Sequence, residues 1–494
     1  MGQAERHAGG PHVGQEQWGT DNPTGIAHDH IAVVATGTTT IARFRGDDCT
    51  DASSGCTPDG PDDETFTLGR DGVPEVHYVD PVAHTIDSIP ITIVLPQGSV
   101  PATGFPVVVF GHGLGASRHD VLSLAEPLAA QGYAVVAIDM WGHGSRFNPI
   151  DTGNNLGSKT GFSGDPALRD GFGDDTGLSA YLDFFEGFLN ISAIRDSIRQ
   201  STLDMSRVAQ LIQNSPSLAA LAGPYATEPK FDPTRVAYLG QSFGTIIGTN
   251  LAALEPSIDL FVLNVAGGGL LDHIFPNSPY IGDLALPFAE ILYGVSGSVD
   301  RFHPLVGALQ AIFDGADSLT FARHVLRDRF TIENQVVGRR HVVILEVMGD
   351  EIMPNIATEA LARAFGMHVL RPNLVAPQGM LQIESPAAGN VNSQTAVLVQ
   401  YSPATHGRNW SAQRGDLEYL PGSPHAGDDK FPKLAKKITI NEPIYETLDQ
   451  VTELLATHFA EQAPRVRTTH VPIADFDGDG KLDGSDPDPL DPTK

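Results

Sequence analysis

Short apolar runs, separated by turn-forming and polar segments, recur along most of the chain. Between residues 105 and 401 the runs are rich in Val, Ile and Leu, which is typical of strands that are buried on both faces. Helical spacing between them predicts helices at 121–131 and 245–254. This alternation predicts an α/β fold, with a mostly parallel central sheet and helices on both of its faces. The predicted strands are 107–110, 133–138, 235–239, 260–263, 342–347 and 396–401.

The segments outside this alternation of strands and helices predict the domain organisation. Residues 1–30 lack periodicity and are expected to be disordered or loosely packed. Residues 31–87 are expected to form a β-rich N-terminal extension to a main domain at 88–465. That domain carries two insertions, at about 145–190 and 267–330, whose apolar positions predict helical caps at the ligand-binding edge of the sheet. An acidic tail at 466–494 follows.

The segment Gly240-Gln241-Ser242-Phe243-Gly244 carries the first candidate chemistry. It joins the predicted strand 235–239 to the predicted helix 245–254. A serine flanked by glycines in this G-x-S-x-G pattern is held on a strained turn, and only small residues fit two positions either side. The turn exposes the hydroxyl to a base, and the following helix aims its free N–H groups at developing negative charge. Ser242 is therefore the candidate nucleophile.

A serine hydroxyl needs a base to take its proton and an acid to orient that base. Asp350 lies in the turn after the strand 342–347, and Glu351 is its rival. His406 follows the last predicted strand, 396–401, by a few residues. His425 is the alternative base, but it lies in a loop rich in Pro, Gly and Asp. The order serine, acid, histidine favours Asp350 as the acid and His406 as the base.

Two backbone N–H groups must also meet the oxygen that becomes negative during acyl transfer. Phe243, the residue after the candidate nucleophile, is expected to supply one of them. The glycine-rich loop 111–115 follows an early strand, and its Leu114 is expected to supply the other. His112 in this loop is interpreted as a brace for the backbone and not as a second base.

Charge and cysteine content restrict the partners and the compartment. The net charge of −29 argues against nucleic acid and anionic membrane surfaces as partners. No apolar run is long enough to span a membrane, and residues 1–7 are not a signal peptide. Cys49 and Cys56, the two cysteines, close a small loop and predict a disulfide, although two unrelated free thiols remain the alternative. A disulfide would place the mature chain in an oxidising compartment, with its leader absent.

Aspartates in the tail predict a calcium site with a structural role. Counted from Asp475, oxygen ligands stand at positions 1, 3, 5, 9 and 12, with glycine at position 6. The pattern departs from the usual helix-flanked loop, because Asp stands at position 12 and no helical pattern flanks it. It resembles the calcium repeats of extracellular bacterial and thrombospondin-type proteins. The candidate residues are Asp475, Asp477, Asp479, Lys481, Asp483 and Asp486.

The motifs around residues 112–115, 139–144, 240–244 and 349–350 together resemble the α/β-hydrolase superfamily over roughly residues 88–460. The insertions and the acidic character look like those of large bacterial secreted or surface lipases and esterases. The resemblance implies hydrolysis of small-molecule, lipid or polymeric carboxylic esters through an acyl-enzyme, without a catalytic cofactor. It implies a secreted, periplasmic or cell-surface protein. The alternatives are a peptidase or acyltransferase with the same triad, and a non-catalytic, calcium-dependent binding protein.

Overall fold

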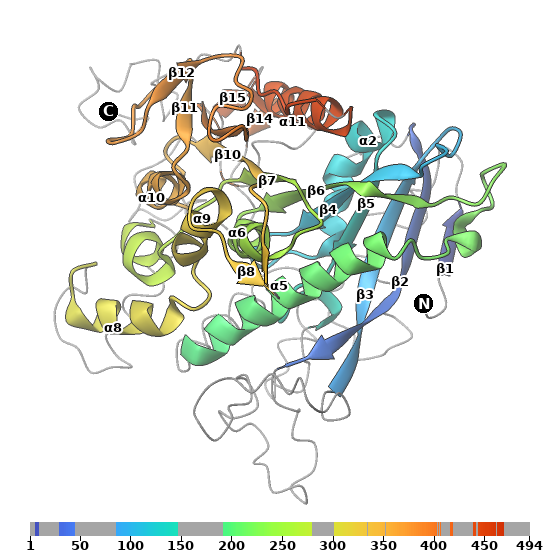
Figure 1. Cartoon of the computed structure of the whole chain (residues 1–494), viewed down its shortest axis with the longest axis horizontal. Coiled ribbons are helices and arrows are strands. Elements are labelled where there is room, and N and C mark those ends of the chain that lie inside the picture. The colour runs from blue at the N-terminus through green and yellow to red at the C-terminus, as the bar shows by residue number, and fades with distance from the viewer. Residues whose placement is uncertain are drawn as a thin grey trace, which may run out of the picture. The chain divides into compact units, whose positions relative to one another are not determined.

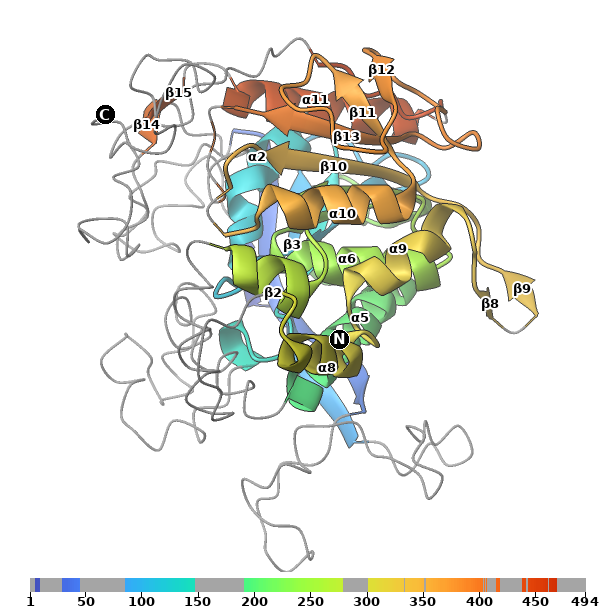
Figure 2. The ribbon, with the colours of Figure 1, turned by 90° about the vertical axis from the view of Figure 1, so that its left-hand side faces the viewer.

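The computed structural model describes residues 5–8, 29–44, 85–146, 191–278, 301–332, 334–350, 352–402, 404, 406, 415–417, 438–440, 443–460 and 462–468. The chain forms two compact units. Unit 1 comprises Met1–Ile258 and Ala308–Thr320, and unit 2 comprises Asp259–Gly307 and Phe321–Lys494. The elements of each unit can be followed by colour in Figures 1 and 2.

The sheet of unit 1 combines an antiparallel part and a parallel part, in the strand order β1-β2-β3-β5-β4-β6. The first strands pair antiparallel through a long β2–β3 ladder, and β3 pairs antiparallel with β5. Strand β4 pairs parallel with both β5 and β6, and every residue of β4 and β5 is buried. The strands are β1 (Glu5–Ala8), β2 (Ile31–Arg43), β3 (Thr85–Pro96), β4 (Phe105–Gly111), β5 (Ala134–Ile138) and β6 (Phe231–Gln241).

In the described part of unit 1, α-helices cover the strands. Helix α2 (Leu122–Ala130) packs on β3 and β5, while α5 (Ile191–Gln213) packs on α6 (Phe243–Leu254) and on β6. Most apolar residues of α5 recur at helical spacing and are buried, so the helix turns one face to the core. Short 3₁₀ turns occur at Arg118–Val121, Gly144–Arg146 and Ala219–Leu221.

Five strands of unit 2 form parallel pairs in the order β7-β10-β13-β11-β12. The central strands are apolar and buried, as expected for strands that are covered on both faces. The strands are β7 (Leu260–Asn264), β10 (His341–Val347), β11 (His368–Arg371), β12 (Gln382–Glu384) and β13 (Ala396–Tyr401). Two small antiparallel pairs are β8 (Thr331–Ile332) with β9 (Gln335–Val336), and β14 (Gly415–Leu417) with β15 (Ile438–Ile440).

The remaining helices lie in the second half of the chain. A π-helical turn at Leu270–Ile274 runs into a 3₁₀ turn at Phe275–Asn277. The α-helices are α8 (Pro304–Phe313), α9 (Ser318–Leu326), α10 (Asn355–Phe365) and α11 (Pro443–Phe459). None of the helices in the described ranges is both long enough and apolar enough to cross a membrane.

The predicted strands and helices of the main domain are all present, and most are longer than predicted. In the second insertion the helical spacing at 305–313 corresponds to α8, and α9 follows it without having been predicted. The helical spacing at 284–292 and the residues 147–190 of the first insertion lie outside the described residues. Within the segment 1–30, residues 5–8 form β1. Helices α5, α10 and α11 and strands β11 and β12 were not predicted.

Candidate active site

Ser242 occupies a strained turn between β6 and α6 in unit 1. Its backbone has φ 51° and ψ −113°, a region that side chains other than glycine seldom adopt. A Cβ at Gly244 would collide with the carbonyl oxygen of Gly111, and a Cβ at Gly240 would lie 2.7 Å from the carbonyl oxygen of Gly244. The flanking glycines are therefore required by the close approach of backbone to backbone.

Hydrogen bonds from two neighbours hold this turn. The hydroxyl of Tyr238 donates to the carbonyl oxygen of Gly244 at 2.7 Å. The hydroxyl of Thr245 donates to the carbonyl oxygen of Ser242 at 2.6 Å, and the Thr245 backbone N–H donates to it at 2.8 Å. Burial raises the pKa of Tyr238 well above its usual range, so the phenol keeps the proton that it donates. The groups that form these hydrogen bonds do not change protonation near neutral pH, so the bonds fix the turn across that range.

The loop with the predicted oxyanion donor Leu114 lies beside Ser242. A Cβ at Gly113 would lie 3.6 Å from the Cβ of Ser242. His112 is fully buried; its Nδ1–H donates to the carbonyl oxygen of Gly113 at 2.8 Å, and its Nε2 accepts from the N–H of Met140 at 3.0 Å. Burial lowers the pKa of His112, so the ring stays neutral with both nitrogens engaged. This residue braces the loop, as predicted.

The other predicted donor residue, Phe243, has its ring stacked on His143, with centroids 5.3 Å apart. His143 donates from Nδ1 to the carbonyl oxygen of Trp141 at 2.8 Å, and the N–H of Trp141 donates to the hydroxyl of Ser201 at 3.0 Å. Burial lowers the pKa of His143 to about 3, so the ring is neutral. Sequence analysis missed this contact, because it joins the loop after β5 to the first residue of α6, which are far apart along the chain.

A buried ion-pair cluster anchors the loop that carries His143. Asp139, fully buried at the end of β5, accepts from the backbone N–H of Arg118 at 2.8 Å and also from its guanidinium. Burial, the largest single influence, raises the pKa of Asp139, but the Arg118 charge, the Arg118 backbone hydrogen bond and the neighbouring histidines together leave the pKa below its usual value. Arg146 donates to Asp204 at 2.6 Å and to the Asp139 carbonyl oxygen at 3.1 Å. The cluster holds both ends of the loop.

Unit 2 brings Asp350 and His406 together at the ends of β10 and β13. The Nδ1 of His406 lies 2.9 Å from each carboxylate oxygen of Asp350, and both side chains are buried. Oδ1 of Asp350 also accepts the backbone N–H groups of Ile352, at 2.9 Å, and Met353, at 2.7 Å. The carboxylate is therefore fixed in its own turn, and it places the imidazole proton on Nδ1. This is the tautomer in which Nε2 can accept a proton.

Several predicted site residues lie outside the described residues. They are the rival acid Glu351, the alternative base His425, the cysteines Cys49 and Cys56, and the tail from Asp475 to Asp486. Among the side chains that are described, no group of three or more His, Cys, Asp or Glu residues could hold a metal ion. Leu114 is described and is half-buried.

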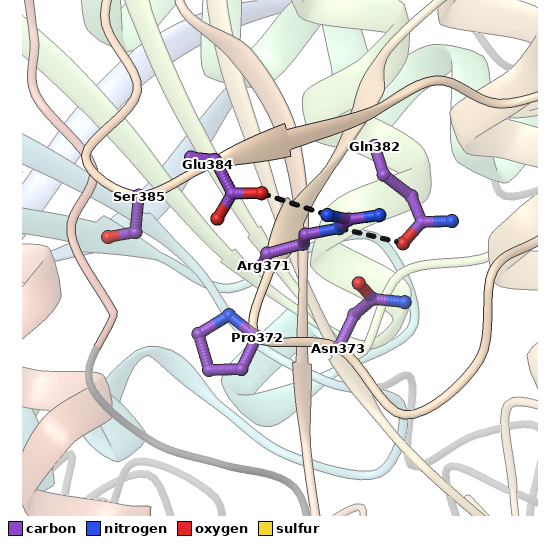
Figure 3. A pocket seen from close by; sticks show the side chains of 6 residues that line it. All are labelled: Arg371, Pro372, Asn373, Gln382, Glu384 and Ser385. Atoms are coloured by element: carbon purple, nitrogen blue, oxygen red, sulfur yellow. Dashed lines mark hydrogen bonds and ion pairs between the residues drawn. The ribbon is translucent and has the colours of Figure 1, made fainter.

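A shallow polar hollow of about 560 Å³ lies in unit 2, next to β11 and β12 (Figure 3). Arg371 spans it, donating to Gln382 at 3.0 Å and to Glu384 at 2.9 Å. Its charge is thus balanced within the hollow. None of the sequence-predicted site residues lines it; the lining residues are Arg371, Pro372, Asn373, Gln382, Glu384 and Ser385.

Comparison with known proteins identifies the fold. The family model described as "alpha/beta hydrolase fold" matches residues 106–293, a range that includes β4, β5, β6, α6 and the Ser242 turn. The fold is therefore an α/β-hydrolase fold, as predicted. A comparison with curated protein sequences finds no match.

Matches among solved structures include two acetyl xylan esterases and an acylaminoacyl peptidase. Acetyl xylan esterase from Paenibacillus sp. R4 is 15% identical (TM-score 0.37; 66% of this chain and 81% of that one covered). Acetyl xylan esterase 1 from Thermoanaerobacterium sp. JW/SL YS485 is 17% identical (TM-score 0.36; 65% and 74% covered). Acylaminoacyl peptidase from Pyrococcus horikoshii is 12% identical (TM-score 0.35; 65% and 36% covered).

Proposed function

We propose that the protein is a serine hydrolase that cleaves carboxylic esters through an acyl-enzyme. The observation that carries the proposal is the strained backbone of Ser242, with φ 51°, between β6 and α6. Such strain persists only where the surrounding structure enforces it, and it is characteristic of functional sites. The buried Asp350–His406 pair supports the proposal, because it supplies the oriented base that a serine nucleophile requires.

The proposed reaction has two halves. His406 takes the hydroxyl proton of Ser242 as the oxygen attacks the ester carbonyl carbon. The resulting oxyanion accepts hydrogen bonds from the N–H groups of Phe243 and Leu114, and collapse of the intermediate expels the alcohol with the proton from His406. Water, deprotonated by His406, then attacks the acyl carbon of the acyl-enzyme. The bond to the Ser242 oxygen breaks, His406 returns the proton to that oxygen, and the carboxylic acid leaves. Asp350 orients the imidazole and stabilises its positive charge throughout.

We expect a fluorophosphonate probe to label the wild-type protein at Ser242. The probe reports an activated serine irrespective of the natural substrate, so it tests the machinery before the substrate class. Ser242→Ala should lose all labelling, because the attacking oxygen is gone. Mass spectrometry of the labelled peptide identifies the site. An unlabelled wild-type protein, or equal labelling of Ser242→Ala, would contradict the proposal and favour the non-catalytic binding protein.

A panel of p-nitrophenyl esters of increasing acyl length, compared with peptide amides, tests the reaction class. Ester turnover that depends on Ser242, with little amide turnover, supports an esterase, and the length profile separates lipase-like from short-chain activity. Preferential amide cleavage would assign a peptidase. Acyl transfer to an added alcohol in preference to water would assign an acyltransferase.

We further propose that the aspartate-rich tail binds calcium and that the chain works outside the cytosol. The ligand spacing from Asp475 to Asp486 and the Cys49–Cys56 pair support this proposal. Removing calcium with EGTA is expected to lower the melting temperature by several degrees, because a ligand of the folded state alone stabilises it by mass action. The kcat of the protein that remains folded should be unchanged. Calorimetry and ester assays with and without calcium measure both, and a chelation-insensitive melting temperature would contradict the proposal.

A further inference from the structure

Glu346 is a fully buried carboxyl group at the last position but one of the otherwise apolar strand β10, four residues before Asp350. It lies opposite Gln400 of β13 in the parallel register. Each of its oxygens accepts one side-chain amide N–H: Oε1 from Asn355 at 3.0 Å, and Oε2 from Gln400 at 2.9 Å. The proposed reaction assigns no role to this residue.

Backbone groups fix the orientation of both amides. The Oδ1 of Asn355 accepts the N–H of Gly349 at 2.8 Å, and its Nδ2 donates to the carbonyl oxygen of Val347 at 2.7 Å. The Oε1 of Gln400 accepts the N–H groups of Leu374 and Val375, both at 2.9 Å. Neither amide can rotate by 180° without breaking these bonds. Both therefore present N–H to Glu346, and only a group that accepts on both sides satisfies them.

The turn that Asn355 holds is the one that carries Asp350. The Asn355 amide bonds Val347 through its Nδ2 and Gly349 through its Oδ1, so it holds the backbone on either side of Met348. Gly349 has φ 72°, and Asp350 follows it directly. A shift of the Asn355 amide therefore displaces the carboxylate that bonds His406.

We propose that Glu346 is a positioning residue, which holds the Asp350 turn through Asn355 and links it through Gln400 to the Leu374–Val375 backbone. The catalytic part of this inference rests on the proposed function, because it takes Asp350 as the acid of the triad. The hydrogen-bond part concerns only the geometry of unit 2.

Burial raises the pKa of Glu346 to about 8, while the amide donors of Gln400 and Asn355 oppose that rise. A carboxyl group at this depth is costly, and an apolar side chain would fill the strand at lower cost. The hydrogen bonds from the two fixed amides offset part of this cost.

Glu346→Gln tests the arrangement. The introduced amide has one acceptor oxygen and one donor NH₂ group. One of the two neighbouring amides, Asn355 or Gln400, therefore points its N–H at another N–H and loses its hydrogen bond. We expect kcat for ester hydrolysis to fall about 10- to 100-fold with KM almost unchanged, because the acid is displaced while the substrate contacts stay. Glu359→Gln is the matched control. It removes a carboxylate from α10 that pairs with Arg363 at 3.3 Å. The charge of Glu359 raises the pKa of Glu346, so its removal leaves Glu346 able to accept from both amides, and the variant should retain wild-type kcat.

The double substitution Glu346→Gln with Gln400→Glu exchanges the two side chains and restores every bond. The carboxylate at position 400 accepts the two backbone N–H groups on one oxygen. Its other oxygen accepts the amide N–H of the glutamine that Glu346→Gln introduces, and the carbonyl oxygen of that glutamine accepts from Asn355. We expect kcat within about threefold of wild type, a recovery that arises only if the two sites are coupled.

A spectroscopic signal tests the positioning without any substrate. The Nδ1 proton of His406, shared with Asp350, should give a far-downfield proton resonance, identified by its loss in His406→Ala. We expect Glu346→Gln to shift or broaden this resonance and the exchange variant to restore it. That pattern in a protein without ester turnover would support the positioning role and reject the proposed function, so the two failures are distinguishable.

Three results would overturn the proposal: an unchanged resonance and kcat in Glu346→Gln with only a lower melting temperature, no recovery in the exchange variant, or an equal loss in Glu359→Gln. If Glu346→Gln does not fold, Asn355→Ala carries the test, because Asn355 is half-buried and its removal cuts the same link. Wild-type kcat and resonance in Asn355→Ala would then overturn the proposal.

Discussion

His406→Ala is expected to lower kcat for ester hydrolysis by about 10⁴- to 10⁶-fold, the loss that follows removal of the base from a serine triad. The Nδ1 of His406 is bonded to both oxygens of Asp350, which leaves Nε2 to take the serine proton. Without that base the hydroxyl of Ser242 stays protonated and is a weak nucleophile. Steady-state assays with a p-nitrophenyl ester, together with the rate of fluorophosphonate labelling, measure the effect.

His425→Ala is the matched control, because it removes the same side chain at the alternative position. It should retain wild-type kcat. His112→Ala would not serve, since that ring braces the loop 111–115 and its loss would disturb the oxyanion donors. Wild-type activity in His406→Ala, with activity lost in His425→Ala, would transfer the role of base to His425.

Local sequence predicted the strands that run through the core, because a strand buried on both faces must be apolar along its length. The ends were less predictable. Strand β6 starts at Phe231, four residues before the predicted start at 235, because Phe231 pairs with Phe105 of β4 ahead of an irregularity in the register. The polar and turn-forming residues 232–235 lie at this irregularity, so no hydrophobic pattern marks the start of the strand.

Helix α5 was not predicted, because its buried face is not wholly apolar. Charged residues interrupt its apolar positions, and Asp196 is fully buried. That carboxylate is compensated on the helix itself, by Arg195 at 2.8 Å and Arg199 at 3.0 Å. In the sequence, the charged residues of such an ion pair suggest a solvent-exposed face of the helix, although the carboxylate of Asp196 faces the core.

The candidate site likewise has residues that local sequence could predict and contacts that it could not. Ser242, Asp350 and His406 could be proposed because each follows a predicted strand, and strand ends are readable from local sequence. The supporting contacts are not local. Glu346 meets Gln400 only through the register of β10 with β13, 54 residues apart, and the stacking of His143 on Phe243 joins a loop to the start of α6. A lone carboxylate in the otherwise apolar run 342–347 was the available signal for Glu346.

Asp350→Asn is expected to lower kcat about 10⁴-fold while the fold is kept, as for the same substitution in other serine triads. The reason lies in the turn. Oδ1 of Asp350 accepts the N–H groups of Ile352 and Met353, so an asparagine would keep its carbonyl oxygen there. Its NH₂ group would then occupy the position of Oδ2, facing Nδ1 of His406.

An NH₂ group in that position reverses the polarity of the contact with the imidazole. Nδ1 would have to accept, the ring proton would move to Nε2, and the nitrogen meant to deprotonate Ser242 would become a donor. Ester assays and thermal unfolding measure kcat and stability, with Glu351→Gln as the neighbouring control of equal charge change. Retained activity in Asp350→Asn, with activity lost in Glu351→Gln, would make Glu351 the acid. Asp350→Asn changes the tautomer of His406 and not the packing around it. We therefore expect kcat to fall while the melting temperature stays close to wild type.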